Sequence, residues 1–141
     1  MAETSYTGAD LIADFIAERC CGVAFLVTGG ACAFIVDAIG RNPKTSFVCF
    51  QHEQAAAMAA DAVWRTTGKV GVTVATSGPG ATNLLTPIAS SYFDSIPVVY
   101  ITGQVNQKEL RTNLSQRQNG FQELDICEMA KSITKKVYKP T

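Results

Sequence analysis

The sequence predicts an α/β fold in which a mostly parallel sheet of five or six strands lies between two layers of helices, a three-layer α/β/α sandwich. Apolar runs without any charged residue, at 23–27, 46–50 and 97–102, are typical of parallel strands that are covered on both faces. Segments with apolar residues at helical spacing separate these runs, so helix and strand alternate. With 141 residues, 47% of them hydrophobic, the chain can form one domain with a sizeable core.

Local signals place the elements of the first half of the chain. The sequence from Thr7 to Asp10 resembles a capping box, with Asp in the acidic position, and starts a helix. Residues 40–44 break the second helix, and Gly68 ends the third. The expected order is a helix from 7 to about 20, a strand at 23–27, a turn at 28–30, a helix through 34–39, a strand at 46–50 and a helix at 53–66.

The second half continues this alternation and then becomes polar. Residues 105–120 contain few apolar anchors, and we expect them to be mobile or covered by a partner. Met58 and Trp64, on the helix at 53–66, are expected in the core. The expected order is a strand at 70–75, a helix at 81–91, a strand at 97–102, the polar segment, a helix at 121–129 and a last edge strand at 133–138.

Charge and cysteine content exclude several classes of function. Twelve basic residues balance twelve acidic ones, which argues against nucleic acid or an anionic membrane as a partner. No apolar run approaches the ~20 residues of a membrane span, and the first five residues are polar, so we expect a cytoplasmic protein. The five cysteines lack CxxC spacing and are expected to be structural thiols. The single histidine, His52, argues against a zinc site and is expected to pack or to cap a helix.

Two junctions between a strand and a helix form the candidate site. Glu53 follows the strand at 46–50, and Gly78-Pro79-Gly80 follows the strand at 70–75. In a parallel sheet such junctions lie at the carboxyl edge, where ligands bind. Taken alone, Glu53 is equally explained as an acid that stabilises a helix start, and the glycines as a tight turn. A dinucleotide-binding loop is less consistent, because Asn83 stands where Gly or Ala is needed and no acidic residue follows at the ~20-residue spacing.

Several motifs, taken together and in order, are far more specific than any one of them. They are HEQAAAMAADA at 52–62, TGKVGV at 67–72, ATSGPGATNL at 75–84, DSIPVVYITGQV at 94–105, FQE at 121–123, DI at 125–126 and ITK at 133–135. Together they resemble the amino-terminal, pyrimidine-binding domain of thiamine-diphosphate-dependent enzymes of the acetolactate synthase group. The resemblance covers nearly the whole chain from about Thr7.

The resemblance implies the thiamine-diphosphate-binding fold and an enzyme that decarboxylates a 2-oxo acid and ligates the product to an acceptor carbonyl. It implies that Glu53 hydrogen-bonds the pyrimidine ring of the cofactor and so promotes loss of the proton at thiazolium C2. Gln122 is the second implied catalytic residue. The remaining implied positions are Gly29, Gly30, Thr76, Pro79 and Asn83 beside the cofactor, Ala31, Phe121 and Gln122 on the substrate side, and Gln104 near the cofactor or a bound flavin.

In that family another domain or subunit holds the diphosphate through Mg²⁺, so the resemblance implies no metal ligand in this chain. It also implies a homodimer or tetramer, and FAD in some members. Residues 1–141 are expected to be one domain, either a fragment of a longer chain or one subunit of a split 2-oxo acid decarboxylase, and inactive when isolated. The alternatives are a Rossmann-like nucleotide-binding module without catalysis and a domain that only dimerises.

The chain departs from the family pattern in two places. Thr28 stands where the family usually has proline, in the loop that shapes the acceptor pocket. The polar segment that contains Arg111 and Arg117 looks longer than usual, and its arginines suit a larger or more acidic substrate than pyruvate. The cofactor is therefore predicted more firmly than the substrate.

Overall fold

The centre of the protein is a parallel sheet. The structure, a computed structural model, describes residues 5–113 and 115–140, and within these ranges the sheet has four strands in the order β2-β1-β3-β4. The strands are β1 (Val23–Leu26), β2 (Ser46–Cys49), β3 (Gly71–Ala75) and β4 (Val98–Thr102). The predicted parallel α/β architecture is confirmed, whereas the predicted five or six strands are too many.

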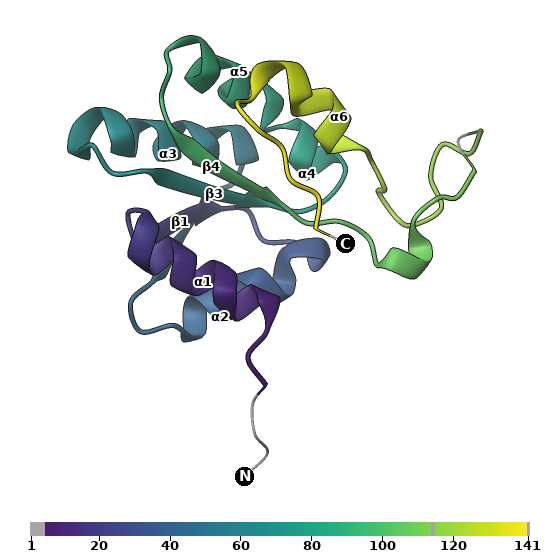
Figure 1. Cartoon of the computed structure of the whole chain (residues 1–141), viewed down its shortest axis with the longest axis horizontal. Coiled ribbons are helices and arrows are strands. Elements are labelled where there is room, and N and C mark those ends of the chain that lie inside the picture. Colours follow the sequence, from purple (N-terminus) through teal and green to yellow (C-terminus); the bar gives the residue numbers. More distant parts are fainter. Residues whose placement is uncertain (1–4, 114, 141) are drawn as a thin grey trace.

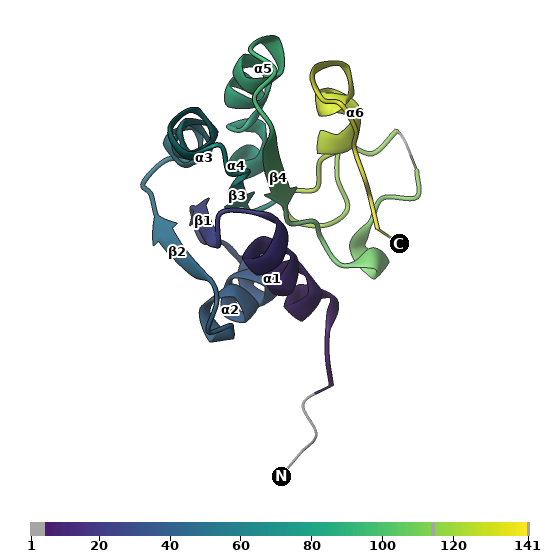
Figure 2. The same ribbon diagram turned by 60° about the vertical axis from the view of Figure 1, so that its left-hand side comes forward.

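Helices cover both faces of this sheet, as the three-layer prediction requires (Figure 1, Figure 2). One layer consists of α1 (Gly8–Arg19) and α2 (Ala33–Arg41). The other contains α3 (Glu53–Thr67), α4 (Pro79–Thr82), α5 (Leu85–Phe93) and α6 (Ile126–Ala130). Short 3₁₀ turns complete the description at η1 (Gly30–Cys32), η2 (Gln107–Glu109) and η3 (Lys131–Ile133).

The core consists of two clusters, one on each side of the sheet. Ile16 of α1 and Ile39 of α2 pack against Leu26 and Val72 on one side. On the other side, Leu84 and Ile88 pack with Ala57 of α3. All of these side chains are at most 5% exposed, so burial of apolar area fixes both helical layers on the sheet.

Local signals at the helix ends agree with the sequence. Thr7 and Asp10 make both hydrogen bonds of the predicted capping box. Gly68 ends α3 in the left-handed conformation, with φ of 69°. His52 is the N-cap of α3, where its Nδ1 accepts a hydrogen bond from the N–H of Gln54 at 3.1 Å. The expectation that His52 packs or caps is therefore confirmed.

The predicted edge strand at 133–138 is wrong. Within this segment, Ile133 ends η3 and packs against the cluster around Leu84 in the helical layer. The Thr134 hydroxyl then donates to the carbonyl of Ala130 at 2.9 Å, which extends the turn of α6. Because the half-buried Ile133 packs with the helical layer, the chain leaves α6 without joining the sheet (Figure 1).

Two predicted helices are also shorter than expected. The helix at 81–91 is divided into α4 and α5, because Pro87 has no N–H to offer to the carbonyl of residue 83 and its ring crowds that carbonyl. The helix at 121–129 begins only at Ile126. Gln122 has a left-handed φ of 58°, and Asp125 caps the helix through a bond from the N–H of Glu128.

Coverage of the sheet and of α3 is less complete than the sequence predicts. The edge strand β2 is exposed at all four residues, so it is not covered on both faces. Met58, expected in the core, is 49% exposed, and Trp64 is half-buried. Helix α3 faces the sheet with Ala56 and Ala60, and a residue two positions from Ala56 lies about 200° around the helix on the opposite side.

Helix α3 lies unusually close to strand β3 at Gly71. A Cβ atom added to Gly71 would lie 1.9 Å from the carbonyl oxygen of Ala60. This contact has no room for any side chain, and it sets the distance of the helix that carries Glu53 from the sheet.

We therefore expect Gly71→Ala to destabilise the protein by about 1–3 kcal/mol or more, because helix and strand must separate. Gly8→Ala is the matched control, since a Cβ at Gly8 meets nothing within 4 Å. Chemical denaturation of both variants measures the difference. Equal stabilities would contradict the close approach of α3 to β3.

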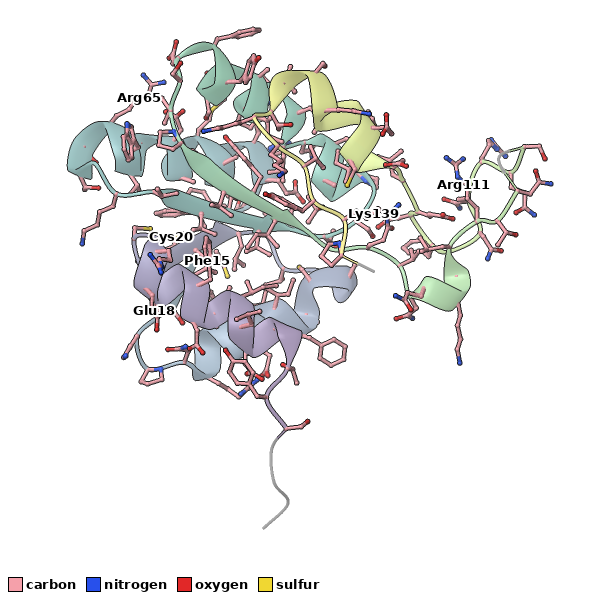
Figure 3. The ribbon with its side chains drawn as sticks, in the orientation of Figure 1. Phe15, Glu18, Cys20, Arg65, Arg111 and Lys139 are labelled. Atoms are coloured by element: carbon pink, nitrogen blue, oxygen red, sulfur yellow. The ribbon has the colours of Figure 1, made fainter. Side chains whose placement is uncertain are left out.

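A polar network joins α3, α5 and β4 on the side of the sheet away from α1. Asp61 accepts hydrogen bonds from Arg65 and, at 2.6 Å, from the buried hydroxyl of Ser91. Ser91 also meets the Tyr100 hydroxyl at 2.8 Å. Arg65, which is labelled in Figure 3, bonds Asp94. Burial opposes the charge on Asp61, but the bonds from Arg65 and Ser91 outweigh it and lower its pKa.

Because the folded pKa of Asp61 is below its ordinary 3.8, its contribution is present above that pH and lost as the pH falls through the folded value. We expect Asp61→Asn to cost about 1–3 kcal/mol at pH 7 and progressively less below pH 3.8. Urea denaturation from pH 2 to pH 7 tests this, with Asp37→Asn as a control on an exposed ion pair. A constant difference across that range would refute the assignment.

Candidate functional site

The order of the strands places one edge of the sheet at a topological switch point. From β1 the chain passes to its neighbour β2 and then returns across β1 to β3, so connections leave β1 and β3 in opposite directions. Ligands of parallel α/β sheets bind outside the carboxyl ends of the strands at such a point. The loops that follow β1 and β3, at 27–30 and 76–78, meet here.

Glu53 lies at this edge, in the first turn of α3, and its carboxyl group is held by the neighbouring junction. Asn83 donates from Nδ2 to Glu53 Oε2 at 2.9 Å. The other oxygen, Oε1, lies over Gly80, where an added Cβ would be only 3.1 Å away. Within the described residues Asn83 is the only hydrogen-bond donor to this carboxyl group, so Oε1 is left for another partner.

The loop after β1 packs directly on the loop after β3. A Cβ on Gly29 would lie 2.5 Å from Cβ of Thr76, so only glycine allows this contact. Gly30, the next residue, is exposed and has nothing within 4 Å of its Cβ position. The predicted cofactor positions Gly29 and Thr76 are thus in contact, while Gly30 faces open space beside them.

Gln122 reaches the same place from a distant part of the sequence. It is half-buried and has φ of 58°, in the left-handed region that costs a non-glycine residue about 1–2 kcal/mol. Its Cβ and carbonyl oxygen lie against Gly78, where an added Cβ would be 2.7 Å from each. Backbone strain of this kind is concentrated at functional sites, where the surrounding structure must enforce it.

The remaining predicted positions lie around this group with less contact. Pro79 is exposed at the first position of α4. Phe121 is 81% exposed, and Ala31 packs against Gly103 after β4. Gln104, predicted near a cofactor or flavin, uses its side chain locally, since it donates to the carbonyl of Leu124 and accepts from the N–H of Val105.

Gly80 belongs to the predicted Gly78-Pro79-Gly80 turn, whereas two further residues that shape this edge, Gly103 and Glu123, are not among the predicted site positions. Gly80 leaves the space in which Glu53 Oε1 lies, and Gly103 allows the contact with Ala31. Glu123 accepts three backbone hydrogen bonds from the preceding loop. The sequence offered one signal for each: Gly103 directly follows a predicted strand, and Glu123 stands beside the predicted pair 121–122.

Within residues 5–113 and 115–140, no three His, Cys, Asp or Glu side chains form a cluster that could hold a metal ion. The same part of the chain contains no helix of the length and apolarity needed to cross a membrane. All five cysteines lie in it as free thiols. The geometry therefore defines a ligand-binding domain of the parallel α/β class, with an acid and glycine-rich loops at its carboxyl edge.

Comparison with known proteins agrees with this class. Residues 6–129 match the family described as "Thiamine pyrophosphate enzyme, N-terminal TPP binding domain". The chain is 44% identical over 133 residues to the chloroplastic acetolactate synthase 2 of Zea mays, covering 93% of this chain and 20% of that enzyme. It is 43% identical over 129 residues to an acetolactate synthase of Mycobacterium leprae and to the acetolactate synthase large subunit of Corynebacterium glutamicum, covering 92% of this chain and 20% of each.

The chain therefore belongs to the family of thiamine pyrophosphate enzymes, as their N-terminal TPP-binding domain, and its relatives are acetolactate synthases. The predicted resemblance is confirmed, and the comparisons favour it over a stand-alone nucleotide-binding module. The chain spans about a fifth of the length of these relatives. The roles of single residues at the edge are not tested by these matches and stay predictions.

The free-energy cost of the left-handed backbone at Gln122 can be compared with the cost at a second residue of the same conformation. Ser95, in the turn between α5 and β4, also has a positive φ, of 56°. We expect Gln122→Gly and Ser95→Gly each to stabilise the isolated chain by about 0.5–1 kcal/mol, because glycine adopts this conformation without strain. Thermal denaturation measures both. A loss of stability in Gln122→Gly alone would show that its side chain contacts outweigh its strain.

Proposed function

We propose that this chain is the pyrimidine-binding domain of an acetolactate synthase-like enzyme that decarboxylates a 2-oxo acid and ligates the product to an acceptor carbonyl. The single observation that carries the proposal is the state of Glu53. One carboxyl oxygen is fixed by Asn83. The other packs against Gly80, at the switch point of the sheet, and accepts no hydrogen bond within the described residues. Family membership supplies the cofactor class, thiamine diphosphate.

The residues at this edge fit such a cofactor. Gly30 has open space at its Cβ position, so a flat ring can approach its backbone closely, and Oε1 of Glu53 can bond a ring nitrogen. When bound, thiamine diphosphate supplies a carbon nucleophile that adds to the carbonyl of a 2-oxo acid. The wall beside the pyrimidine would be formed by Gly29, Thr76, Pro79 and Asn83. Gly30, which has no side chain, would leave the path of the pyrimidine to this wall open.

Glu53 has the proton-handling role in this proposal. A carboxyl group that bonds the pyrimidine nitrogen can hold or release a proton at Oε1 while Oε2 keeps its bond to Asn83. The fixed Oε2 bond orients the group, so each proton transfer takes place at the same atom and position. Asn83 is therefore a positioning residue for Glu53.

Ala31, Phe121 and Gln122 would face the substrate. Gln122 is presented from a strained backbone directly on the Gly78 turn, and Phe121 offers an exposed ring beside it. Arg111, considered as a reader of acidic substrates, donates from Nη1 to the carbonyls of Gln116 and Arg117. Its contacts support a role within the loop, so a small 2-oxo acid remains the proposed substrate.

The proposal includes the parts that this chain does not supply. A diphosphate-binding domain, on the same or another polypeptide, would hold Mg²⁺ and the diphosphate, in a homodimer or tetramer, and FAD is a further proposed ligand near Gln104. The split-enzyme arrangement, with this chain as one subunit, fits the same site. Five free thiols fit a reducing compartment, and we propose the cytoplasm.

The test is Glu53→Gln in the assembled enzyme. The amide keeps the size and a hydrogen bond but cannot carry the proton, so we expect deuterium exchange at C2 of bound thiamine diphosphate to slow by about 10²–10⁴-fold. Folding should change by only about 0.3–1 kcal/mol. Glu128→Gln, on an exposed ion pair, is the control and should exchange like the wild type. Equal rates in all three proteins would leave Glu53 as a helix-start acid only.

A further inference from the structure

The loop before Gln122 is closed by a single carboxylate. Glu123 Oε1 accepts a hydrogen bond from the backbone N–H of Arg111 at 2.8 Å. Its Oε2 accepts from the N–H groups of Asn119 at 2.8 Å and of Gly120 at 3.4 Å. One side chain therefore joins both ends of the segment 111–120, whose described residues, 111–113 and 115–120, extend beyond the carboxyl edge of the sheet (Figure 1, Figure 3).

The contacts of Glu123 bear directly on the strained residue beside it. Gln122 lies between Glu123 and the contact with Gly78, and the carbonyl of Leu124 is held by Gln104 at 3.1 Å. A glutamine in the left-handed conformation persists only where the surrounding structure enforces it. On the loop side of Gln122 the chain is held by the hydrogen bonds of Glu123. On the α6 side it is held by the bond from Gln104 to the carbonyl of Leu124.

The electrostatics of Glu123 agree with this role. The hydrogen bond from the backbone N–H of Arg111, followed by the one from Asn119, lowers the pKa of Glu123. The group is thus a carboxylate at neutral pH, and bonds from N–H groups to a charged acceptor are stronger than bonds to a neutral one. No other carboxylate among the described residues makes this set of bonds to the 111–120 segment.

We propose that Glu123 is a positioning residue of the site: its carboxylate clamps the base of the 111–120 segment and thereby holds Gln122 in its left-handed conformation against Gly78. The effect of Glu123 on catalysis rests on the proposed function. The effect of Glu123 on the conformation of Gln122 does not. Loss of the carboxylate should free the segment and allow Gln122 to relax away from the cofactor-facing loops.

The structural part is tested by NMR on the chain itself, with Glu123→Ala and Glu123→Gln. In the alanine variant we expect the amides of Arg111, Asn119 and Gly120 to exchange about tenfold faster. The Cα and Cβ chemical shifts of Gln122 should leave the left-handed range. Gly103, whose N–H bonds the Ala75 carbonyl, is the internal reference and should not change. Glu128→Ala is the matched control. Unchanged exchange and unchanged Gln122 shifts would overturn the proposal.

The catalytic part uses the assembled enzyme. We expect Glu123→Ala to lower kcat/KM for the 2-oxo acid about tenfold or more, with C2 exchange of the cofactor unchanged and Glu123→Gln intermediate. A mobile loop with unaltered kcat/KM would overturn the positioning role. An absence of C2 exchange in the wild type would refute the proposed function instead, and the NMR result would still decide whether Glu123 holds Gln122.

Discussion

The site depends on direct contact between loops that leave the sheet in opposite directions. Strands β1 and β3 are neighbours, yet their connections pass to different strands, so a space opens between the loops at this point. Gly29 against Thr76 closes part of that space, and Gly80 leaves room for the carboxyl group of Glu53. A side chain at Gly29 or Gly80 would push apart the loops that meet at this edge. The rest of the site therefore requires glycine at these two positions.

The packing of helix α3 on the sheet fixes the position of Glu53. The position of Glu53 follows from where α3 lies, and α3 is set by the contact of Ala60 with Gly71 of β3. The network of Asp61 with Ser91 then ties the middle of α3 to α5. Asn83 completes the arrangement at the start of the helix through its bond to Glu53. The carboxyl group is therefore oriented by a frame and does not depend on its own rotamer preference.

Much of this arrangement could be predicted from the sequence because the signals were local. Apolar runs gave the strands, and Thr7 and Gly68 gave helix ends through hydrogen bonds and backbone conformation within a few residues. The break between α4 and α5 also has a local cause, the missing N–H of Pro87 in the first turn of α5. The missing edge strand was different, because Ile133 packs against the cluster that contains Leu84, far away in sequence, and a short apolar run does not reveal which layer it will join. Glu53 was found by its place at a junction, whereas its bond to Asn83 across 30 residues was not.

The two acids of the site illustrate different uses of a carboxylate. Glu53 has one donor among the described residues, on Oε2, which leaves Oε1 without a hydrogen bond there, an arrangement that suits exchange of a proton with a ligand. Glu123 has both oxygens occupied by backbone N–H groups, which suits a permanent charge that orders a loop. The two roles need opposite surroundings, so neither residue can replace the other. Gln122 precedes Glu123, and its strained backbone is held by the packing against Gly78 and, in our proposal, by the carboxylate of Glu123.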